Sequence, residues 1–236
     1  MAKKRSESKP DKADIAAVIG RLLAISGIKE LVNLYFAHPV PERPSSRNFA
    51  GYRFDSLPEN PSERIVASDL VAVSLLDVTF RPEAVDALLS DGPINNLLEK
   101  LPEGVDLWHA RESVDDLLEI FGVLDDLHGI GPTKASKLLA RKRPQLAPIT
   151  DRHVAKVFSC VGWEFLMPLA DCLAERSDLV TKLEGLKPKT TEVVVEPSVL
   201  RLLDVAIWMT QSGATSAQDA REVALGQREP VEVRAT

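Results

Sequence analysis

The sequence predicts an all-α protein, and three observations support that class. Apolar residues recur at intervals of three and four along most of the 236 residues, which is the spacing of amphipathic helices. Prolines interrupt these periodic stretches, with five of them between residues 39 and 64, so helices alternate with loops. A hydrophobic content of 44% in a chain of this length is enough to build a buried core.

The elements of the first part follow from the same spacing. Residues 15–36 predict a helix with a break near Gly27, and residues 39–64 predict loop, with 52–54 as a candidate extended segment. Residues 68–78 form a very apolar helical segment, and residues 81–101 contain two more short helices.

In the second part, residues 165–186 read as helical and residues 187–196 as a loop. Residues 198–209 are apolar on nearly all sides, which is typical of a central helix. A last helix at about 217–225 precedes a polar tail, and the tryptophans at 163 and 208 lie in apolar helical surroundings that predict core positions.

The most informative stretch is Leu127 to Val154, which begins at a turn containing Gly129, Ile130 and Gly131. Periodic apolar residues precede the turn from Val114 onward, and Pro132 after it suits the first position of a second helix. Glycines permit positive φ and leave no side chain over the turn, so the amides of the second helix can approach a phosphate. The second helix is expected to end before Pro144.

A cluster of cations follows this turn, although the chain as a whole has a net charge of -6. Seven cations lie between residues 134 and 156 with Asp151 as the only acid, and Lys134, Lys137 and Arg141 share one helical face by their spacing. Such a local positive field attracts phosphates. The alternative is a solvated helix face with no ligand.

Two segments together carry a family resemblance: Leu127-x-Gly129-Ile130-Gly131-x-x-x-Ala135 and Pro148-Ile149-Thr150-Asp151-x-His153-Val154. They resemble the helix-hairpin-helix DNA glycosylase superfamily, the relatives of endonuclease III and the adenine glycosylases. The run from Ala135 to Pro144 also resembles an uncharacterised bacterial family. The resemblance covers about thirty residues strongly and the rest of the chain through its helical pattern.

The resemblance implies two helical lobes flanking a cleft, DNA as the partner, and Asp151 as the catalytic residue. A carboxylate in that place stabilises the developing positive charge on the sugar and activates a water. The implied DNA contacts are Gly129, Ile130, Gly131, Thr133, Lys134, Lys137, Arg141 and Arg152. Asp151 also fits a second interpretation, in which it caps the helix that follows it and has no catalytic role.

Two departures from the family pattern narrow the chemistry. Thr133 stands where bifunctional members carry a lysine nucleophile, so the sequence predicts a monofunctional enzyme in which water attacks. Two cysteines cannot build the iron–sulfur cluster that several members hold, and no Cys/His spacing predicts a zinc site, so no cofactor or metal is expected.

The predicted organisation has five parts: a basic disordered tail (1–13), an N-terminal helix and proline-rich loop that pack with the second lobe (14–64), a bundle ending in the hairpin (65–147), a second lobe (148–212), and a C-terminal helix and tail (213–236). No apolar run reaches membrane-spanning length and the first residues lack a signal-peptide core, so we expect a cytoplasmic protein without membrane contacts. The oligomeric state is left open. Two further functions remain as alternatives: a DNA-binding protein of the same fold without catalysis, and a helical protein–protein interaction module.

Overall fold

The predicted all-α class is confirmed. A computed structural model describes residues 9–37, 49–90, 92–188, 195–231 and 233, and within these residues it has twelve α-helices and no strand. The helices are α1 (Lys12–Leu23), α2 (Ile28–Phe36), α3 (Ala67–Ser74), α4 (Pro82–Leu89), α5 (Pro93–Lys100), α6 (Val114–Asp125), α7 (Gly131–Lys142), α8 (Arg152–Phe158), α9 (Leu166–Glu175), α10 (Ser177–Glu184), α11 (Val199–Gln211) and α12 (Thr215–Leu225). Three short 3₁₀ turns accompany them: η2 (Ala50–Arg53), η3 (Leu107–His109) and η4 (Arg111–Ser113).

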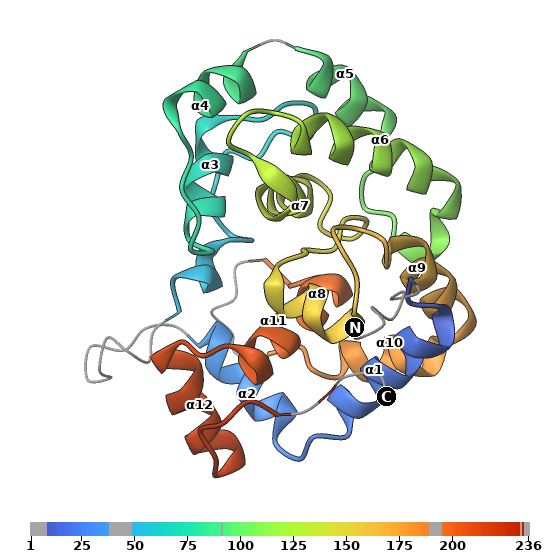
Figure 1. Cartoon of the computed structure of the whole chain (residues 1–236), viewed down its shortest axis with the longest axis vertical. Helices are drawn as coiled ribbons and strands as arrows, with labels where there is room; N and C mark the ends of the chain where they lie inside the picture. Colours follow the sequence, from blue (N-terminus) through green and yellow to red (C-terminus); the bar gives the residue numbers. More distant parts are fainter. Residues whose placement is uncertain (1–8, 38–48, 91, 189–194, 232, 234–236) are drawn as a thin grey trace, which may run out of the picture.

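The helices gather into two groups (Figure 1). In the first group α7 packs against α6 and α3, and α5 packs against α6. In the second, α11 packs against α2, α8, α10 and α12, while α1 lies along α9 and α10. The first and last helices described, α1 and α12, belong to the same group, because both pack against α11.

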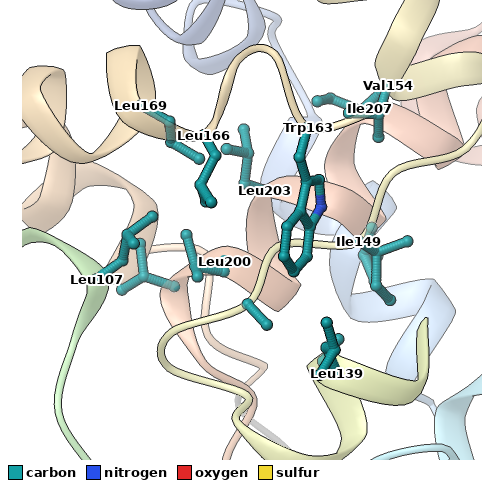
Figure 2. Close-up of a cluster of buried hydrophobic side chains, with 14 of the residues drawn as sticks. Leu107, Leu139, Ile149, Val154, Trp163, Leu166, Leu169, Leu200, Leu203 and Ile207 are labelled. Atoms are coloured by element: carbon teal, nitrogen blue, oxygen red, sulfur yellow. The ribbon is translucent and has the colours of Figure 1, made fainter. Parts of the chain in front are cut away.

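Helix α11 is central, as its apolar sequence predicted. Twelve of its 13 residues are buried, and Trp208, the exception, is partly buried. Figure 2 shows part of the core around it, where Leu200, Leu203 and Ile207 of α11 meet Trp163 and side chains of α8 and α9. Leu139 of α7 and Ile149 reach the same cluster, so this core joins the two groups of helices.

Three predicted elements are corrected by the structure. Residues 12 and 13 belong to α1 and not to the predicted disordered tail (1–13), because Asp11 and Asp14 form a capping box that starts α1 at Lys12; residues 1–8 of that tail lie outside the described residues. Residues 50–53 form the 3₁₀ turn η2, so the candidate extended segment at 52–54 is wrong. Residues 165–186 are two helices, since Arg176 leaves helical geometry at φ -119° and ψ 64°. The loop predicted at 187–196 lies partly outside the described residues.

The break predicted near Gly27 is confirmed and gives a stability prediction. Gly27 has φ 87°, and a Cβ atom there would overlap the carbonyl oxygen of Ala224 in α12. Gly27→Ala should therefore lower the free energy of unfolding by more than the roughly 1–2 kcal/mol that a left-handed conformation costs an L residue. Urea denaturation measures this change.

Gly20 provides the matched control. It lies inside α1, and a Cβ there would have no neighbour within 4 Å. Gly20→Ala should raise the free energy of unfolding by about 0.5–1 kcal/mol, because alanine loses less backbone entropy in a helix. Equal effects of the two substitutions would contradict this account of the Gly27 turn.

Candidate functional site

The glycine turn joins α6 to α7 as a tight helical hairpin. Gly129 and Gly131 have φ of 84° and 68°, and Ile130 between them is buried, with its amide on the carbonyl of Leu127 at 3.0 Å. A Cβ at Gly131 would meet nothing within 4 Å, so close packing does not explain this glycine. The space directly over Gly131 is therefore open, whereas the side chain of Arg81 lies over Gly129.

The prediction that a basic helix face lies at the surface beyond the turn is wrong. Lys137 and Arg141 are only 6% and 3% exposed, and both side chains point into the protein. The Nζ of Lys137 donates to the carbonyl of Leu76 at 2.8 Å. These two cations are therefore not available to a phosphate at the surface, and Lys137 and Arg141 are not candidate DNA contacts.

Arg141 and the two residues after it form a buried cation cluster with Asp69. Arg141 donates to the carbonyls of Phe54, Asp55 and Leu57, and its Nε lies 3.4 Å from Asp69 Oδ1. Lys142 pairs with Asp69 and donates to the side-chain oxygen of Asn60 and the carbonyl of Pro61. Arg143 donates to the carbonyls of Leu98, Leu101 and Ser62. The cluster thus fixes the segment from Phe54 to Ser62 against α7.

The remaining predicted contacts lie closer to solvent. Gly129, Gly131, Thr133 and Lys134 are half-buried, and Arg152 is exposed. The Nζ of Lys134 donates to the carbonyl of Gly129 at 2.6 Å and lies 5.7 Å from the centre of the Phe80 ring. Lys134 therefore stabilises the glycine turn through this hydrogen bond, and its ammonium group places a positive charge next to the turn.

Asp151 caps a helix and also faces a cavity. Its Oδ1 accepts hydrogen bonds from the backbone amides of His153 and Val154 at 2.8 and 3.0 Å, which is the N-cap arrangement for α8. Within the part of the chain that the structure describes, Oδ2 accepts no hydrogen bond, and the residue lines a cavity of about 320 Å³. The capping interpretation is thus correct in geometry, and it leaves one carboxylate oxygen for a ligand.

The segment that carries Asp151 is fixed to α7. Ser136 Oγ accepts the amide of Thr150 at 3.0 Å and donates to the carbonyl of the same residue at 3.1 Å. The indole of Trp163 donates to the carbonyl of Pro148 at 2.9 Å, and Thr150 Oγ1 donates to the carbonyl of Gly162. These bonds set the position of Asp151 relative to the hairpin helix.

The cavity lies where the two groups of helices meet. Side chains of α2 and α11 and the residues around η2 line one side, and the end of α3, Lys137 of α7 and the segment from Ile149 to Asp151 line the other. Ala214 and Ser216, at the start of α12, complete the lining. At about 320 Å³ the cavity is at the small end of the range for small-molecule sites, which is roughly 300–1,000 Å³.

Buried charges line this cavity. Arg201 donates to Asp55 at 3.1 Å, to Asp204, to the Tyr35 hydroxyl at 2.8 Å and to the carbonyl of Gly51 at 3.1 Å. Burial raises the pKa of Asp204 to about 6; the charge of Asp151 adds to the rise, and Arg201 opposes it. Burial also raises the pKa of Tyr35 to about 12, so this phenol stays protonated at neutral pH.

Lys137 is the second buried cation of the cavity. Burial lowers its pKa, and the carboxylates of Asp151 and Asp204 act in the opposite direction. Burial likewise lowers the pKa of His153, whose Nε2 lies 3.3 Å from Arg152 Nε. Asp151 and Lys137 are thus the two predicted site residues that the structure brings together in the cavity.

The sequence interpretation missed Tyr35, Arg201, Asp204 and Trp208 as cavity residues. A signal existed for two of them, because Arg201 and Asp204 are opposite charges three residues apart within an otherwise apolar helix. Charged residues seldom lie fully buried unless they are paired, so this spacing marks a polar site inside the core. Tyr35 and Trp208 carry no comparable signal.

Neither a metal site nor a membrane helix is found in the described residues. No three His, Cys, Asp or Glu side chains among them come together as metal ligands. None of the helices described is long and apolar enough to cross a bilayer.

Comparison with known proteins gives one match. Residues 28–211 match the model described as Family of unknown function (DUF6308). No curated protein and no solved structure matches the chain. The matched region runs from the start of α2 to the end of α11 and includes the hairpin, Asp151 and the buried charges of the cavity. The chain therefore belongs to the family DUF6308.

Proposed function

We propose that the chain is a DNA-binding protein of the helix-hairpin-helix glycosylase type, with two helical lobes flanking a cleft, and that it excises a base as a monofunctional glycosylase. The observation that carries the proposal is the placement of Asp151. One of its oxygens is fixed by two backbone amides, and the residue lines the cavity together with Lys137 of the hairpin helix α7. A carboxylate that is held rigidly beside a cavity is suited to activate a water.

The proposed reaction has one bond-forming and one bond-breaking event at the sugar. An extruded base enters the cavity, and its sugar lies at the mouth beside Asp151. The carboxylate accepts a proton as the water oxygen bonds to the sugar carbon, and the bond from that carbon to the base nitrogen breaks. Its negative charge also stabilises the positive charge that develops on the sugar. The base leaves with the bonding electrons and takes up a proton, and an intact abasic site remains.

The DNA backbone would be held by the start of α7. The predicted contacts that remain compatible with burial are Gly129, Gly131, Thr133, Lys134 and Arg152. Ile130 is buried and its amide is already bonded to the carbonyl of Leu127, so it is not among them. The α7 helix dipole and the open space over Gly131 favour a phosphate at this place. Such contacts carry no base information, so binding should be nearly independent of sequence.

The hairpin contact is tested with Lys134→Glu combined with Arg152→Glu. Affinity for duplex DNA should fall across all sequences, and the slope of log affinity against log salt should decrease by about 0.9 per lost phosphate contact. Fluorescence anisotropy over a salt series measures both. A matched control, Lys29→Glu with Lys182→Glu, makes the same charge change on exposed positions of α2 and α10. Equal losses in the two double variants would contradict a contact at the hairpin.

The chemistry is tested with duplexes that carry a panel of damaged or modified bases, followed by alkali to reveal abasic sites. We expect an alkali-labile product without strand cleavage before alkali and without a borohydride-trapped adduct, because water attacks. A trapped adduct would contradict the monofunctional assignment, and Lys137 in the cavity would be the first lysine to replace.

The alternative function is DNA binding without catalysis, which the capping role of Asp151 favours. It predicts salt-dependent binding and no product from any substrate of the panel.

A further inference from the structure

Asp204 is a buried carboxylate that lines the same cavity as Asp151. It is 7% exposed and lies on α11, one turn after Arg201. Arg201 Nη1 binds its Oδ2, and in the described part of the chain no hydrogen bond reaches its Oδ1. The cavity lining therefore includes a carboxylate with one oxygen engaged from the protein side and one oxygen left for a ligand.

Arg201 is itself almost fully used by the protein. Its guanidinium donates to Asp55, Asp204, Tyr35 and the carbonyl of Gly51, and it lies 5.3 Å from the centre of the Tyr35 ring. The close approach needs a glycine at 51, because a Cβ there would overlap the Tyr35 hydroxyl. Arg201 thus holds Asp204 and Tyr35 in place and has little capacity left for a ligand.

The charge of the lining favours a ligand with hydrogen-bond donors. Asp77, Asp151 and Asp204 face the cavity, against Lys137 and Arg201. Arg201 is bound to two carboxylates, and the Lys137 ammonium is bound to the carbonyl of Leu76. An anion such as a phosphate would meet uncompensated carboxylates inside the cavity, whereas N–H groups would find acceptors.

Aromatic rings form part of the cavity lining. Phe49 and Trp208 both line it, with ring centres 5.9 Å apart and an angle of 87° between their planes. Tyr35 adds a third ring 5.2 Å from Phe49 and brings its hydroxyl next to Arg201. Flat apolar surfaces beside a carboxylate and a phenol are typical of sites that bind nitrogen heterocycles.

We propose that Asp204 is the specificity-determining residue of the cavity and selects a planar nitrogen heterocycle whose edge carries an exocyclic amine. This inference rests on the proposed function, because it takes the ring to be the extruded base. The cavity would then select bases with an exocyclic amine over bases with an oxo group at the same position. Oδ1 of Asp204 accepts a hydrogen bond from the amine, and Arg201 keeps the carboxylate in position.

Free adenine and hypoxanthine test the proposal because they share one ring system. Adenine carries an amine at C6 beside an unprotonated N1, whereas hypoxanthine carries an oxo group at C6 beside an N1–H. Binding is followed through the indole N–H signal of Trp208 in NMR spectra, assigned with Trp208→Phe. At pH 7.5 we expect adenine to bind at least about tenfold more tightly than hypoxanthine, which corresponds to about 1.4 kcal/mol. Asp204→Asn should remove the preference. Asp77→Asn, the same change at an exposed position of the lining, should retain it.

The pH dependence of the wild-type protein gives a readout that needs no variant. Asp204 faces Arg201 on its own helix, Tyr35 from α2, Lys137 from α7, and Asp55 and Asp151 from loops. With a pKa of about 6, its carboxylate takes up a proton as the pH falls from 7.5 to 5.5 and then accepts donors less well. The preference for adenine should therefore shrink over this range, and Asp204→Asn should lose that dependence.

Three outcomes would overturn the proposal: equal or tighter binding of hypoxanthine at pH 7.5, a preference that does not change with pH, or no shift of the Trp208 signal with either purine. These outcomes are separate from the test of the enzyme activity. Excision without preference for an amine would contradict the role of Asp204 alone. A preference for adenine without any excision would contradict the glycosylase proposal and leave Asp204 as the residue that selects the ligand.

Discussion

Replacing Asp69 with alanine should lower the free energy of unfolding by about 3–5 kcal/mol, the range seen when one partner of a buried ion pair is removed. The carboxylate is fully buried and faces Arg141 and Lys142, whose side chains are also buried. Burial lowers the pKa of Lys142, and the Asp69 carboxylate opposes that shift. Without the Asp69 carboxylate, the buried charges of Arg141 and Lys142 would be compensated only by hydrogen bonds to carbonyl and side-chain amide oxygens. Urea denaturation followed by circular dichroism measures the loss.

Asp178 is the matched control for this prediction. It also pairs with an arginine and a lysine, Arg176 and Lys182, but all three side chains are exposed. Water screens such pairs strongly, so Asp178→Ala should leave the unfolding free energy nearly unchanged. A small effect at Asp69, comparable with that at Asp178, would contradict the view that the buried cation cluster fixes the Phe54–Ser62 segment.

Replacing Asp151 with asparagine should reduce excision about 10²–10⁴-fold, the usual contribution of a general base. Asparagine caps a helix about as well as aspartate, so the two hydrogen bonds to His153 and Val154 should survive. The change in stability should stay within the roughly 1 kcal/mol that a charge at a helix N-terminus contributes. DNA affinity should be equal or slightly higher, because a negative charge near the backbone is lost. The assay is the alkali treatment described above, applied to whichever substrate gives a product.

Asp11 allows the capping role to be separated from catalysis. It caps α1 with the same pattern, since its Oδ1 accepts the amides of Ala13 and Asp14 at 2.8 and 2.9 Å, and it is exposed to solvent. Asp11→Asn should leave excision unchanged. Full excision by Asp151→Asn would show that Asp151 is only a cap, and a loss of activity in both variants would point to general destabilisation.

Local signals in the sequence determined several of the helices and some of their ends. The periodic apolar residues placed the central helix at 198–209, and Gly27 marked the break between α1 and α2. The turn at Gly129 to Gly131 and the end of α7 before Pro144 follow from backbone conformations that those residues favour. These predictions succeeded because each depends on interactions within a few residues of the chain.

The tertiary structure alone decided where the charged side chains point. Lys137 and Arg141 have the spacing of a solvated basic face, yet their partners are backbone carbonyls at Leu76 and at residues 54–57, more than fifty residues away. Every residue carries a carbonyl, so the sequence has no mark for the ones that will accept a buried cation. The meeting of Asp151 with Asp204 and Tyr35 in one cavity likewise depends on how α2, α7 and α11 pack. Spacing along a helix determines which side chains share a face, and only the packing of distant segments determines whether that face meets water or protein.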